Sequence, residues 1–297
     1  MEYHPNLDDK SDEFPNLNCV RRVLKYFHAN FLYFGSAFLF PVVVAYGVHN
    51  AADKLARSAM KHVLYPGDTL PYRELAIGGM LRWGGYALVV VVFGLAVAGT
   101  TIAVGEIRRG NDRPPFEVAL QRPRARLWAI AGSALLQFIG LMLSSVLSTF
   151  LAGSFIIKTG LPTKFILWLG WTLLALCLAI FSRWMLSVPI LIEENCGVFA
   201  SLRRSQHLTA HYTPAMLVFV AHAAVGGYIA GIVPYYLFNL VARRNTLPSW
   251  SGWVPFALSF LFVAWTEPIY AIGCAETYYA AQERERQEEI PRSIEVT

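Results

Sequence analysis

Six long apolar stretches constrain the fold of this chain more than any other feature of its sequence. A helix needs about 20 apolar residues to cross the roughly 30 Å hydrocarbon core of a bilayer. The stretches that reach this length are Asn30–Val48, Trp83–Val104, Leu127–Leu151, Phe165–Ser187, Ala215–Leu237 and Val254–Cys274. They are continuous, whereas the strands of a barrel would alternate polar and apolar residues. The sequence therefore predicts an all-α polytopic membrane bundle of six transmembrane helices.

Composition supports this class. The chain is 55% hydrophobic and 15% charged, which suits helices in lipid better than a soluble domain. We expect a polar N-terminal tail over 1–18, a transmembrane domain over 19–281 and a charged C-terminal tail over 282–297. The first 18 residues are polar and mildly acidic, unlike a cleavable signal. No basic folded module is predicted, which argues against nucleic acid as a partner.

Lys and Arg set the predicted orientation. Most of the 25 basic residues fall in segments that face the cytoplasm if the N-terminus does. We therefore expect both termini inside. The first outside segment, His49–Arg82, weakens this bias because it carries several basic residues of its own.

Three of the predicted inside segments carry an apolar stripe beside basic residues. The stripes are Leu17, Val20, Leu24 and Phe27 beside Arg21, Arg22 and Lys25; Phe116 and Leu120 beside Arg122, Arg124 and Arg126; and Val198, Phe199 and Leu202 beside Arg203 and Arg204. This pattern is typical of an amphipathic helix lying in the membrane interface. We expect three such helices, contacting anionic lipid headgroups. The alternative is that inside loops of membrane proteins are basic in general.

Ionisable and strongly polar groups inside a span are costly, so they are candidate functional residues. Glu267, followed by Pro268, lies in span six and could form a proton or cation site. The alternative is a structural ion pair with Arg183 near the end of span four. His222 in span five and Gln137 in span three could belong to a proton relay, or could hydrogen-bond between helices.

Signatures of catalysis, cofactors and metals are missing from the sequence. It contains no phosphate-binding glycine loop and no Gly-x-Ser-x-Gly nucleophile motif. His207 and His211 are four residues apart, but no His-Glu-x-x-His pattern accompanies them. We predict no catalytic, cofactor-binding or metal site.

The stretch after span four reads RWMLSVPILIEE over 183–194 and GVFASLRRSQHLT over 197–209. It resembles a broad group of six-span bacterial membrane proteins, often described as the membrane domain of glycerophosphoryl diester phosphodiesterases and largely uncharacterised. The resemblance covers most of the chain from Glu106 onward and implies a bacterial cytoplasmic membrane. It also implies that one motif stabilises the turn from span four into its interfacial helix; its residues are Arg183, Pro189, Glu193, Arg204 and Ser205. Phosphodiesterase activity does not carry over, because it belongs to a separate soluble barrel for which this chain has no room.

Two functions follow as expectations. The first is a non-catalytic multi-pass membrane protein that acts as an anchor, scaffold or lipid-interacting module, with other membrane proteins as possible partners. The alternative is a small-solute or ion transporter or channel that uses Glu267. An enzyme would need a cluster of reactive groups, which the sequence does not display.

Overall fold

All secondary structure in the described part of the chain is helical. The computed structural model describes residues 15–36, 72–111, 114–140, 181–242 and 254–294, with the isolated positions 43, 47–48, 51, 143, 172, 175 and 178–179. The elements are α1 (Pro15–Ala29), α3 (Tyr72–Arg108), α4 (Phe116–Ala119), α5 (Gln121–Ala125), α8 (Ser187–Glu193), α9 (Val198–Leu208), the 3-10 helix η1 (Thr209–His211), α10 (Thr213–Ala242) and α11 (Val254–Ile294). A further apolar helix covers Leu127–Gly140. The all-α prediction is confirmed for these residues.

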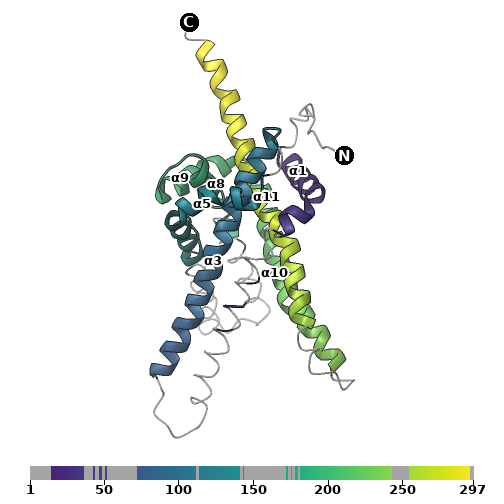
Figure 1. The fold of residues 1–297 in the computed structure, drawn as a ribbon. Coiled ribbons are helices and arrows are strands. Elements are labelled where there is room, and N and C mark those ends of the chain that lie inside the picture. Colours follow the sequence, from purple (N-terminus) through teal and green to yellow (C-terminus); the bar gives the residue numbers. More distant parts are fainter. Residues whose placement is uncertain are drawn as a thin grey trace.

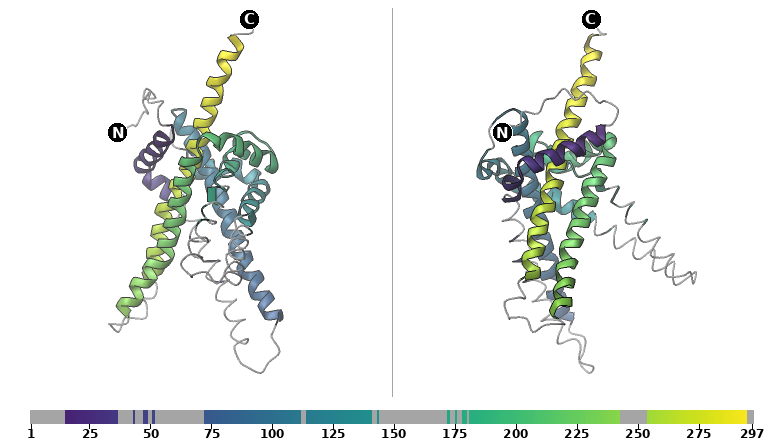
Figure 2. Two further views of the ribbon diagram at one scale, coloured as in Figure 1. Left: turned by 180° about the vertical axis from the view of Figure 1, so that it is seen from behind. Right: turned by 90° about the vertical axis from the view of Figure 1, so that its right-hand side faces the viewer.

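Three long helices, α3, α10 and α11, form the framework of the fold. Figure 1 shows α10 and α11 running side by side in opposite directions, with α3 crossing at an angle. The short helices α1, α4, α5, α8 and α9 gather at one end of the long ones, and we call them the helical layer (Figures 1 and 2). α11 passes through this layer and continues beyond it.

The described parts of the segments predicted to face the cytoplasm all lie at the helical-layer end (Figure 2). They comprise α1, the stretch from the end of α3 through α5, the stretch from the turn before α8 through η1, and the last third of α11. The prediction puts two membrane crossings between one inside segment and the next. It therefore requires that these segments lie on the same side of the bundle.

The long helices extend past the predicted spans. Spans two, five and six lie inside α3, α10 and α11, and α3 already begins at Tyr72, within the predicted outside segment. About half of span one and half of span four lie outside the described residues, as does the end of span three. Span four was predicted to reach Ser187, but residues 183–186 form a turn and α8 begins at Ser187.

One helix of the described residues, Trp83–Arg108, is long and apolar enough to cross a membrane, by length and composition. The bundle of six spans therefore stays a prediction. The segment predicted as a charged C-terminal tail is helical as far as Ile294, where α11 ends.

α10 and α11 approach closely because of a glycine. A Cβ atom built on Gly273 of α11 would lie 2.6 Å from the ring of Phe219 on α10. Phe219 is buried, together with Met216 and Ile272 beside it. The main core therefore lies where α10, α11 and α1 meet, close to the helical layer.

α1 buries a face that only partly overlaps the stripe predicted to lie in the membrane interface. Leu24 of that stripe is 41% exposed, whereas Phe27 is buried in the protein. The helix packs through Cys19, Val23 and Tyr26 as well as Phe27, which recur at helical spacing. α1 is thus apolar on two sides: one contacts α11 and α10, and the other, with Leu24, faces outward.

Candidate functional site

Ser205 joins α9 to the turn that precedes α8. Its hydroxyl donates a hydrogen bond to the carbonyl oxygen of Arg183 at 2.6 Å and accepts one from the N–H of Leu186 at 3.2 Å. Thr209 Oγ1 lies 3.3 Å from the same carbonyl. Because Ser205 is fully buried, these bonds provide partners for backbone groups that would otherwise be buried unpaired.

Arg126 closes the other end of α8. Its guanidinium donates to the carbonyl oxygens of Leu191 at 2.7 Å, Asn195 at 3.3 Å and Cys196 at 3.4 Å. Asn195 has a φ of 53°, in the left-handed region that ends many helices. A positive charge at these free carbonyls is favourable. The sequence predicted that Arg126 flanks a lipid-facing stripe, but its guanidinium binds backbone carbonyl groups of the protein.

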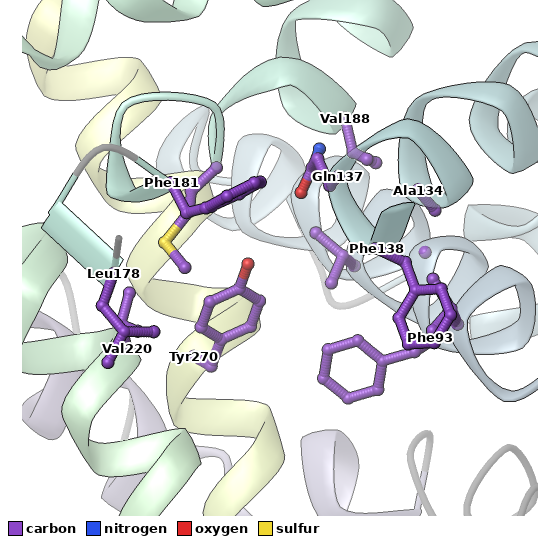
Figure 3. Close-up of a pocket in the computed structure, with 13 residues that line it drawn as sticks. Phe93, Ala134, Gln137, Phe138, Leu178, Phe181, Val188, Val220 and Tyr270 are labelled. Atoms are coloured by element: carbon purple, nitrogen blue, oxygen red, sulfur yellow. The ribbon is translucent and has the colours of Figure 1, made fainter. Parts of the chain in front are cut away.

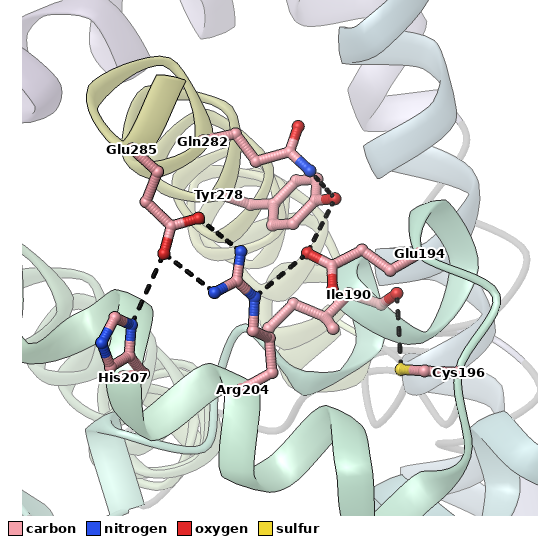
Figure 4. A network of polar contacts seen from close by, with 8 residues as sticks. All are labelled: Ile190, Glu194, Cys196, Arg204, His207, Tyr278, Gln282 and Glu285. Carbon is pink, nitrogen blue, oxygen red and sulfur yellow. Dashed lines mark hydrogen bonds and ion pairs between the residues drawn. The ribbon is translucent and has the colours of Figure 1, made fainter. Parts of the chain in front are cut away.

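A charged network fastens α9 to α11, as Figure 4 shows. The Arg204 guanidinium donates to both carboxylate oxygens of Glu285, one at 2.8 Å, and its Nε lies 3.5 Å from Glu194. His207 Nδ1 lies 3.5 Å from the Glu285 carboxylate. A two-pronged contact of this kind fixes geometry as well as charge. The sequence prediction grouped Arg203 with Arg204. Of these two, Arg203 is exposed and has no partner among the described residues, whereas Arg204 belongs to this network.

Tyr278 extends this network to the end of α8. Gln282 Nε2 donates to the Tyr278 hydroxyl at 2.5 Å, and that hydroxyl lies 3.5 Å from Glu194. Burial raises the pKa of the Tyr278 hydroxyl above its ordinary value, so it stays protonated and can donate to the carboxylate.

A second, more deeply buried ion pair joins α3 to α11. Arg108 Nη1 lies 3.1 Å from Glu276, and Arg108 Nη2 lies 2.5 Å from Glu283. The Arg108 and Glu276 side chains are 13% and 2% exposed. Burial raises the pKa of Glu276, and the neighbouring Arg108 opposes that shift. The Tyr279 ring lies 5.5 Å from the guanidinium and covers it.

The predicted ion pair between Arg183 and Glu267 is not formed. The helix before α8 ends at Ser182, so Arg183 lies in the turn, with an exposed side chain. Glu267 lies on α11, roughly 13 Å along the helix from Glu276, and has neither an ion pair nor a hydrogen bond among the described residues.

Gln137 and His222 lie in different surroundings. Gln137 Nε2 donates to Ser187 Oγ at 2.5 Å, and Ser187 in turn shares a 2.8 Å hydrogen bond with Ser133. Gln137 therefore hydrogen-bonds between helices, which was the alternative to a role in a proton relay. His222, on α10, has a buried Nε2 without a partner in the described ranges. Neither His222 nor Glu267 lines the cavity that Gln137 faces, so the three candidates do not form one relay there.

That cavity has a volume of 220 Å³ and lies between α3, α8, α10, α11 and the helix Leu127–Gly140. Its walls are mainly apolar, and Figure 3 shows the residues around it. The lining residues include Phe93, Ala134, Gln137, Phe181, Val220 and Tyr270.

The remaining motif residues also have places in the structure. Pro189 is buried in α8, and Glu193 lies 3.9 Å from Arg109. Among the described residues, no three His, Cys, Asp or Glu side chains are placed to share a metal ion. His211, a candidate ligand, is exposed on η1.

No family model, no curated protein and no solved structure matches this chain. The resemblance to the six-span bacterial group therefore stays a prediction, and function has to be argued from the molecule itself.

Sequence reasoning missed three of the charged residues that organise this region. Arg126 and Glu285 lie in segments whose charge density suggested solvent or lipid contact. Glu276 carried a clearer signal, because it is an isolated acid within the apolar run Ile269–Ala281. A buried acid in such a run needs a cation, and Arg108 provides it.

Replacing Ser205 with Ala should lower the free energy of unfolding by about 1–3 kcal/mol, because two backbone groups lose a buried partner. Thermal unfolding of the purified protein measures this. Ser201→Ala is the matched control: Ser201 is buried on the same face of α9, but its hydroxyl donates only to Val198 in its own turn. Equal losses in the two variants would contradict the role given to Ser205.

Proposed function

We propose that this chain is a non-catalytic multi-pass integral membrane protein that acts as an anchor, scaffold or lipid-interacting module. The observation that carries the proposal is outward apolar surface on all three long helices. Met80 on α3 is 74% exposed, Leu237 on α10 is 53% exposed and Leu261 on α11 is 60% exposed. In water such surfaces favour aggregation, whereas in lipid they have their preferred solvent.

The helical layer supports contact with a membrane interface. Trp128 is 86% exposed and Phe199 is 78% exposed, and aromatic side chains favour the headgroup region of a bilayer. The exposed arginines of this layer and of the turn before α8 that make no ion pair or hydrogen bond with the described residues are Arg21, Arg122, Arg124, Arg183 and Arg203. Cations on that side attract anionic lipid headgroups.

The finer features of the proposal rest on the sequence. The Lys and Arg distribution supports a position of the helical layer at the cytoplasmic leaflet, with both termini inside. The resemblance to the six-span group supports a bacterial cytoplasmic membrane. The missing catalytic motifs support a role without chemistry, and exposed helix surfaces could contact other membrane proteins.

Spin labels should report three depths in lipid nanodiscs. In a variant that lacks the four native cysteines, labels at Leu261→Cys, Phe199→Cys and Arg286→Cys should fall in that order from deep to aqueous. Accessibility to oxygen, which concentrates in the bilayer, and to a water-soluble nickel complex measures the order. The proposal is wrong if the label at 261 is as accessible to nickel as the label at 286.

Arg203→Gln should weaken binding of phosphatidylglycerol about fivefold, which corresponds to about 1 kcal/mol for one basic residue near an anionic surface. Native mass spectrometry with added lipid measures it. Arg286→Gln, an exposed arginine on the α11 extension, is the control and should leave binding unchanged. If both variants behave like the wild type, the helical layer does not recognise anionic headgroups through Arg203.

A proton or cation transporter is the second candidate, favoured by Glu267, which has no ion pair with the described residues. An acid at membrane depth without a cation partner is a candidate ion site, and Pro268 removes a backbone donor next to it. In liposomes containing a pH dye, Glu267→Gln should abolish proton flux, while the exposed control Glu117→Gln should not. Flux that is unchanged by Glu267→Gln would exclude Glu267 from transport.

A further inference from the structure

The 220 Å³ cavity has the size of a small-molecule site. An apolar cavity of about 150 Å³ holds benzene, so this one can take a ring with a short substituent. Gly94 and Ala134 let α3 and the helix Leu127–Gly140 pack closely at one wall of the cavity: a Cβ atom on Gly94 would lie 3.2 Å from that of Ala134. A whole phospholipid is far too large for this volume.

Gln137 presents a hydrogen-bond acceptor to this space. Its amide nitrogen is committed to Ser187 and lies 3.5 Å from Ser133. This leaves the amide oxygen without a partner in the described part of the chain, and Figure 3 shows Gln137 at the cavity edge. The serines orient the amide, because donation by the nitrogen decides where the oxygen points.

Tyr270 presents a hydroxyl from α11. The ring packs on Phe93 with centroids 5.9 Å apart, and Figure 3 shows the hydroxyl directed into the space beside Phe181. Its neighbour is the Cys274 thiol, a weak hydrogen-bonding group. The hydroxyl therefore retains the capacity to bond to a ligand.

We propose that the cavity binds one small amphipathic molecule with a hydroxyl group. Its apolar body lies against the aromatic wall of Phe93 and Phe181, and its hydroxyl donates to the Gln137 amide oxygen and hydrogen-bonds to Tyr270. Water fills such a space poorly, since a buried water needs two to four polar partners and the remaining walls are apolar. The exposed arginines of the helical layer do not line this cavity, so the site does not depend on the proposed lipid contacts.

The test uses 4-fluorobenzyl alcohol and 4-fluorotoluene, which differ by one hydroxyl, as fluorine NMR probes of the protein in nanodiscs. The wild type should bind the alcohol more tightly than the toluene. Val220→Phe fills the cavity from α10 and should abolish binding of both probes. Val218→Phe adds the same ring on the 51% exposed side of α10 and should bind like the wild type.

Tyr270→Phe should reduce affinity for the alcohol about three- to tenfold, the effect of one lost hydrogen bond, and should leave the toluene unchanged. Val90→Phe fills the cavity from α3 and replaces Val220→Phe if that variant does not fold. Equal binding by the filled and wild-type proteins would overturn the site. An alcohol preference that survives in Tyr270→Phe at full strength would overturn its polar end.

Discussion

The buried contact between Arg108 and Glu276 is the constraint on which the arrangement of the long helices depends. Removing one partner from such a pair leaves an uncompensated charge, typically a loss of 3–5 kcal/mol, so the pair specifies one register of α3 against α11. Glu283 and the Tyr279 ring complete the surroundings of the guanidinium. Since α10 and α1 pack on α11, the position of the whole bundle near the helical layer follows from this register.

The long apolar runs were sufficient to predict the helical class and the helices α3, α10 and α11 that contain the predicted spans two, five and six, because a long apolar run favours a helix over other structures. It could not predict which partner each charge would choose. Arg183 was paired with Glu267 on the assumption that span four continued, whereas the chain turns at 183–186. Gln137 was identified as a polar group in an apolar helix, but its neighbours Ser133 and Ser187 depend on tertiary packing that no local pattern encodes.

The inward face of α9 carries two small hydroxyl residues beside one apolar residue. Ser201 and Ser205 are fully buried together with Leu208, Thr209 is fully buried at the start of η1, and Phe199 faces outward. Small hydroxyl residues let two backbones approach and supply hydrogen bonds where apolar burial would supply area. Burial of these hydroxyl residues follows backbone hydrogen bonding, and it leaves Phe199 of the predicted interfacial stripe free of the protein core.

α11 is one helix from Val254 to Ile294, about 60 Å long at 1.5 Å per residue. Glu276 binds it to α3 and Glu285 binds it to α9, roughly two and a half turns apart. An element held at two points along its axis cannot pivot about either of them, so α11 fixes the position of α3 relative to α9.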